Sequence, residues 1–82
     1  MDYEAIDREM SLWVVTCVHN ERRFFLANDF CATDILSRAQ RFRDESRARD
    51  IADIERKDEA WHGQFDWQPM SRAEVSGLAL GA

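Results

Sequence analysis

One segment of the chain repeats its apolar residues at the spacing of a helix. In TDILSRAQRFRDESR, from Thr33 to Arg47, the apolar residues Ile35, Ala39 and Phe42 follow one another at steps of four and three. Residues at these steps lie on one face of a helix. Thr33 is also a residue type that caps helix N-termini. The pattern therefore predicts a helix over residues 33–47.

Two runs that precede this segment have the composition of β-strands. Leu12 to His19 and Arg23 to Asn28 are rich in β-branched and aromatic residues, which strands prefer. Asn20-Glu21 lies between them, and Asn tolerates the positive φ that tight hairpin turns require. We expect these two runs to form a β-hairpin.

Side-chain alternation divides the residues of this predicted hairpin between two faces. The first face is uniformly apolar and is expected to lie against the helix; it holds Trp13, Val15, Cys17, Phe24 and Leu26. The second face holds Leu12, Val14, Thr16, Val18, Arg23, Phe25 and Ala27. It is less polar than a solvent-facing sheet surface should be.

Four explanations for the apolar second face remain open from the sequence. An N-terminal helix could cover it through Tyr3, Ile6 and Met10, or a C-terminal helix through Leu78 and Leu80. Alternatively, a second copy of the chain or another protein could bind there.

The segment after the predicted helix alternates large and polar residues. This alternation predicts a strand from Trp61 to Gln68, which Pro69 would end because proline cannot donate to a sheet ladder. Asp58-Glu59 would be its turn, and Asp50 to Lys57 the partner strand. A break in the helix near residues 47–50 is expected, because Ile51 and Ile54 would otherwise lie off its apolar stripe.

The C-terminal segment carries a helix-start signal. Ser71-x-x-Glu74 has the spacing of a capping box, so a short helix is expected from Arg72 to about Leu80. Together these elements predict an α+β fold of ββαββ order, in which one helix covers one face of a single antiparallel sheet made of two hairpins. The terminal segments can add short helices, and residues 1–82 are expected to form one small domain.

Composition narrows the classes of partner. The 82 residues include sixteen acidic and eleven basic side chains, for a net charge of −5. This balance argues against direct binding of nucleic acid through its phosphates and suits a partner with a basic surface. No apolar run reaches membrane length and the first residues lack a signal-peptide pattern, so we expect a cytoplasmic protein without membrane contact.

The cysteines and histidines give only weak signals for a metal site. Cys17-x-His19 places a thiol and an imidazole on one strand face, and Cys31 and His62 would complete four ligands. Zinc sites normally show paired short spacings, of which this chain has one. The sequence therefore predicts no metal and no cofactor, and a small zinc- or thiol-dependent protein remains one alternative.

Catalytic groupings are equally weak. Cys17 beside His19 would be buried on the core side, and His62 with Asp66 or Glu55 would lie on an open sheet face. No arrangement of nucleophile, base and oxyanion donors can be assembled from these residues. We therefore expect a protein that is not an enzyme.

The candidate binding residues come from both predicted hairpins. The apolar second face of the first hairpin supplies Leu12, Val14, Val18 and Phe25, and the acidic face of the second hairpin supplies Asp53, Glu55 and Asp66. These residues predict a protein–protein interaction module.

In size, acidic balance and compact ββαββ shape, the chain resembles the small inhibitors encoded by bacteriophages and mobile elements, such as anti-CRISPR proteins. The resemblance is one of general style and assigns no residue a role. It implies blockade of a basic site on a host nucleic-acid-processing complex. The other main alternative is a structural or assembly protein that forms a homodimer through the apolar face.

Overall fold

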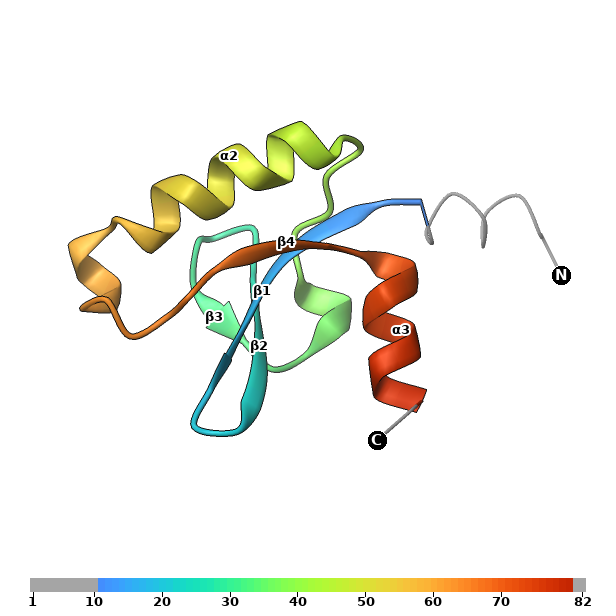
Figure 1. Cartoon of the computed structure of the whole chain (residues 1–82), viewed down its shortest axis with the longest axis horizontal. Coiled ribbons are helices and arrows are strands. Elements are labelled where there is room, and N and C mark those ends of the chain that lie inside the picture. Colours follow the sequence, from blue (N-terminus) through green and yellow to red (C-terminus); the bar gives the residue numbers. More distant parts are fainter. Residues whose placement is uncertain (1–10, 81–82) are drawn as a thin grey trace, which may run out of the picture.

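The fold is built around one antiparallel sheet of four strands in the order β3-β2-β1-β4 (Figure 1). The computed structural model describes residues 11–80, with side chains described up to residue 77. The strands are β1 (Trp13–His19), β2 (Arg22–Leu26), β3 (Ala32–Thr33) and β4 (Gln68–Ser71). The main helix is α2 (Glu45–Arg56), the C-terminal helix is α3 (Arg72–Leu80), and the two short 3-10 turns are η1 (Leu36–Arg38) and η2 (Glu59–Trp61). The expected α+β class, with a single antiparallel sheet and one main helix packed on it, is confirmed.

The first hairpin forms as the sequence predicts. In its register Thr16 lies opposite Phe25 and Cys17 opposite Phe24. Asn20 and Glu21 both have positive φ, 53° and 67°, as a two-residue hairpin turn of type I′ requires. The hairpin is thus specified locally, by strand-forming residues on either side of a turn that can reach the left-handed region.

The helix predicted over residues 33–47 is wrong. Its apolar stripe is divided between the two faces of the sheet, because Phe42 is buried with Val15 and Ala39 with Val14. The backbone of this segment bridges to the strands instead, Ala39 to Ala27 and Phe42 to Trp13. The Phe42 N–H donates to the Trp13 carbonyl and the Trp13 N–H donates back, both at 2.8 Å. Pairing of the backbone with distant strands has overridden the local helical spacing, which is a weak determinant of structure.

Helix α2 occupies the region where the sequence predicted a break and then a strand from Asp50 to Lys57, so both predictions are wrong. Its inward face is formed by Ala48, Ala52 and Glu55, with Ile51 half-buried beside them. These residues follow one another at helical spacing, but the most deeply buried of them are small. A pattern based on large apolar residues therefore does not reveal this face.

The strand predicted from Trp61 to Gln68 is also wrong, because most of this segment is not in a sheet. The prediction of which side chains face inward is confirmed. Trp61 closes η2, residues 64–67 form no ladder, and Gln68 begins β4. Trp61, Phe65 and Trp67 nevertheless pack into the core. Pro69 does not end a strand: it lies within β4, opposite Val15. Proline is tolerated there because β4 is an edge strand, whose outer side needs no donor.

The C-terminal helix forms as predicted. The Ser71 hydroxyl accepts a hydrogen bond from the Glu74 N–H at 3.1 Å, which caps the first turn of α3. The helix predicted around Tyr3, Ile6 and Met10 lies outside the described residues.

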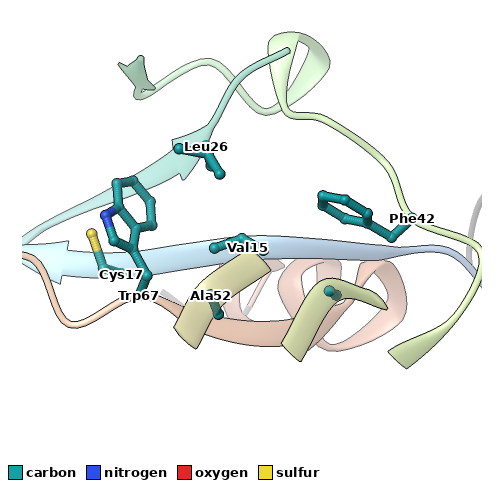
Figure 2. Close-up of a cluster of buried hydrophobic side chains, with 7 residues drawn as sticks. Val15, Cys17, Leu26, Phe42, Ala52 and Trp67 are labelled. Atoms are coloured by element: carbon teal, nitrogen blue, oxygen red, sulfur yellow. The ribbon is translucent and has the colours of Figure 1, made fainter. Parts of the chain in front are cut away.

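Two clusters of buried side chains lie on opposite faces of the sheet, because neighbouring β1 residues such as Val14 and Val15 belong to different clusters. The cluster beneath α2 consists of Val15, Cys17, Leu26, Phe42, Ala48, Ala52 and Trp67. Figure 2 shows the Trp67 ring beside Cys17 in this cluster. Trp67 also stacks on Phe65, with ring centroids 5.7 Å apart, and meets the edge of Trp61 at 5.2 Å. The predicted helix-facing side of the first hairpin is therefore confirmed as core.

Candidate functional site

The second face of the first hairpin is largely covered from within the protein. Val14 and Phe25, both predicted to bind a partner, are 0% and 5% exposed. They pack with Ala39 from the segment after η1 and with Val75 from α3. Helix α3 thus covers this face through Val75, whereas the sequence-based explanation placed the cover on Leu78 and Leu80, whose side chains lie outside the described residues. Val14 and Phe25 consequently offer no surface to another molecule.

The remaining apolar candidates, Val18 and Leu12, do not belong to this buried cluster and differ in their exposure to solvent. Val18 is 55% exposed near the tip of the hairpin, whereas Leu12 is half-buried at its base. Val18 borders a shallow groove of about 270 Å³ that also contains Arg23 and Met70. The Arg23 guanidinium donates to the Thr16 hydroxyl at 3.2 Å. Val18 is therefore a single exposed apolar residue beside a hydrogen-bonded arginine.

The acidic candidates do not form the shared surface that the sequence predicted. Asp53 and Glu55 belong to α2, where two positions differ by about 200° around the helix axis, and Asp66 lies in the extended segment before β4. Asp53 pairs with Arg56. Asp66 is exposed and accepts a hydrogen bond from the Gln68 side-chain amide at 3.0 Å.

Glu55 has a structural contact and is not solvated as predicted. It is buried on the inner side of α2, and one carboxylate oxygen accepts a hydrogen bond from Trp61 Nε1 at 2.8 Å. A buried carboxylate needs such a partner, because removing it from water is otherwise costly. The bond joins the last turn of α2 to η2.

Opposite charges are paired along the groove between α2 and β4. The residues that line it include the ion pairs of Arg49 with Glu45 and of Arg56 with Asp53, together with Trp13 and Pro69. The groove encloses about 430 Å³ and is open to solvent. These ion pairs cancel most of the local charge, so the groove does not present a field of one sign.

The four residues of the hypothetical zinc set lie in different surroundings. Cys17 is buried, and this burial raises the pKa of its thiol to about 11. His19 packs against Phe65, with ring centroids 4.5 Å apart, whereas Cys31 is exposed and His62 caps η2. Among the residues that the structure describes, no three His, Cys, Asp or Glu side chains are grouped as metal ligands would be.

No described helix is both long and apolar enough to cross a membrane.

Comparisons with protein-family models, with curated proteins and with solved structures give no match. The function is therefore inferred from the described residues and their chemistry.

The most distinctive surface was missed by sequence-based reasoning. It comprises Phe30 and Ile35, which are 50% and 44% exposed at either end of β3, together with the aspartates that precede them, Asp29 and Asp34. We call this surface the β3 edge. The signal in the sequence is the Asp-apolar pair, in Asp29-Phe30 and Asp34-Ile35, although the same pair also occurs at Asp50-Ile51, Asp53-Ile54 and Asp66-Trp67. It was hidden because Ile35 had been placed inside a predicted helix.

Proposed function

We propose that the protein is a non-enzymatic binding module that forms a stoichiometric complex with another protein. The observation that carries this proposal is Phe30, an aromatic residue with half of its surface exposed and a φ of 61°. The left-handed conformation costs a residue with a Cβ roughly 1–2 kcal/mol. Unfavourable conformations of this kind tend to persist where function requires them.

Charge favours one class of target. The net charge of −5 suits a basic protein surface, such as a site that normally receives nucleic acid. We propose that the module blocks such a site on a host nucleic-acid-processing complex, as small phage and mobile-element inhibitors do. The protein itself would then act in the cytoplasm, without direct contact with nucleic acid or membrane.

The test is affinity capture followed by a measurement of stoichiometry. The tagged protein is incubated with a nuclease-treated bacterial extract, and proteins that survive a moderate salt wash are identified by mass spectrometry. The retained protein is then purified and titrated with the module by calorimetry. We expect saturation at a fixed ratio and weaker binding as salt rises, because the target surface is basic.

Two results would contradict the proposal. One is the failure of any host protein to be retained at a level comparable with the bait. The other is a module that forms homodimers and binds nothing else, which would favour a role in self-assembly.

A further inference from the structure

We propose that the β3 edge is the binding surface, and that its partner is a protein with two apolar pockets, each bordered by lysine or arginine. This inference rests on the proposed function and specifies the surface and the chemistry of the partner. It differs from the sequence-based prediction, whose apolar residues Val14 and Phe25 are buried.

Phe30 has the properties of an anchor residue. It belongs to neither of the two buried clusters formed by the described residues, and half of its surface is in contact with solvent. Its backbone is in the left-handed region, which Gly or Asn would occupy with less strain. Aromatic side chains that enter a pocket on the partner contribute disproportionately to protein–protein affinity.

The turn that carries Phe30 is held in place by hydrogen bonds. The Phe30 N–H donates to the Ala27 carbonyl at 2.9 Å, and the Ala27 N–H donates to the Cys31 carbonyl at 2.9 Å. The Asp29 carboxylate accepts from the Cys31 N–H at 3.1 Å. An anchor on a fixed turn loses less conformational entropy when it binds than one on a mobile loop.

Ile35 supplies the second apolar contact. Its N–H donates to the Thr33 hydroxyl at 3.1 Å, which fixes the backbone where the chain leaves β3. Because Phe30 and Ile35 are five residues apart in the chain, their Cα atoms lie at most about 18 Å from each other. Both residues therefore fall within the width of one ordinary protein–protein interface.

The two aspartates determine the charge that the partner should carry. Asp29 is exposed directly beside Phe30, and Asp34 beside Ile35. Asp34 pairs with Arg22 at 3.2 Å, but both side chains are largely exposed, and such surface pairs contribute little to stability. Asp34 can therefore exchange Arg22 for a cation on the partner at low cost. Apolar pockets beside basic residues complement this arrangement.

Val18 and Ile54, the other exposed large apolar residues among those described, each stand alone. Val18 lies beside the hydrogen-bonded Arg23. Ile54 also follows an aspartate, but Asp53 is half-buried and pairs with Arg56, and no second exposed large apolar residue lies within five positions of Ile54. Scattered residues of this kind are ordinary on protein surfaces. Ile54, at 61% exposed, therefore provides a matched control for Phe30 and Ile35.

The experiment compares four variants, using as probe the purified protein that the wild-type module retains. Phe30→Asn removes the ring and suits the left-handed backbone, and Ile35→Thr keeps the β-branch. A double variant, Asp29→Asn with Asp34→Asn, keeps the oxygen that accepts from Cys31 and removes both charges. Ile54→Thr is the control. Circular dichroism establishes that each variant is folded, and Phe30→Gly replaces Phe30→Asn if the latter is not.

We expect the dissociation constant to rise at least tenfold in Phe30→Asn and severalfold in Ile35→Thr, and to stay within twofold in Ile54→Thr. The double aspartate variant should bind more weakly and with less dependence on salt. Unchanged binding by folded Phe30→Asn would overturn this inference, whereas the complex itself would still support a binding module that uses another surface. If the wild-type module retains no protein, or if Phe30→Asn only dissociates a homodimer, the inference is overturned as well.

Discussion

At the scale of single residues, the contact between Glu55 and Trp61 links α2 to the segment that follows it. We expect Trp61→Phe to lower the free energy of unfolding by about 1–3 kcal/mol, because the buried carboxylate then lacks its donor. Glu55→Gln should cost less, since its amide oxygen can still accept the bond. Urea unfolding followed by circular dichroism measures both variants. Equal losses in the two variants would contradict a role for the hydrogen bond.

Cys17 makes stability depend on pH in the alkaline range. Burial raises the pKa of its thiol from 9.0 to about 11. Between these values the unfolded chain loses the proton and the folded protein keeps it, so the unfolded state binds fewer protons. The free energy of unfolding should therefore be constant with respect to this group below pH 9 and fall as pH rises toward 11.

Unfolding measured across this range tests the cause. Cys31→Ser should keep the alkaline loss of stability, because Cys31 is exposed, whereas Cys17→Ala should reduce it. An identical loss in wild type and Cys17→Ala would assign the effect to another group.

At the scale of elements, the sequence predicts structure well where the signals are local. The first hairpin and α3 each depend on neighbouring residues, namely the Asn20-Glu21 turn and the cap from Ser71 to Glu74. The helix over residues 33–47 failed because Ala39 and Phe42 pair with strands far away in the chain. Helix propensity and hydrophobic periodicity depend on neighbouring residues only, so they cannot predict pairing with a distant strand.

The sequence did not predict helix α2, because the most deeply buried residues on its inner face have small side chains. Ala48 and Ala52 are fully buried against the sheet, so we expect Ala52→Leu to overpack this contact and destabilise the protein by about 1–3 kcal/mol. Ile54→Leu on the outer side of the same helix should be nearly neutral, because Ile54 is exposed. Thermal unfolding compares the two variants. A neutral Ala52→Leu would mean that α2 does not pack closely on the sheet.

The start of α3 supplies a further test. We expect Ser71→Ala to cost about 1 kcal/mol, because the Glu74 N–H loses its acceptor. Ser46→Ala in the exposed first turn of α2 is the matched control and should change stability by only a few tenths of a kcal/mol. If urea unfolding gives the same small change for both, the Ser71 hydroxyl is not an effective cap.

At the scale of the whole molecule, the candidate site was harder to predict than the fold class. The sequence showed that the second face is too apolar for solvent but assigned its residues to a binding surface, whereas Val14 and Phe25 are covered by Val75, which follows Phe25 by fifty residues. The acidic surface depended on treating Asp53 and Glu55 as strand residues, and it disappeared once they were placed on a helix. The β3 edge becomes visible only when the turn around Phe30 is known.

We propose that the protein forms a complex with a host protein, and the molar mass of that complex is the most direct test. The module and the purified protein that it retains are mixed at equal concentrations and measured by light scattering after size-exclusion chromatography. We predict one peak whose mass equals the partner plus a fixed number of modules, and two separate peaks when Phe30→Asn replaces the wild type. Separate elution of wild-type module and partner, or a peak containing only module homodimers, would contradict the claim.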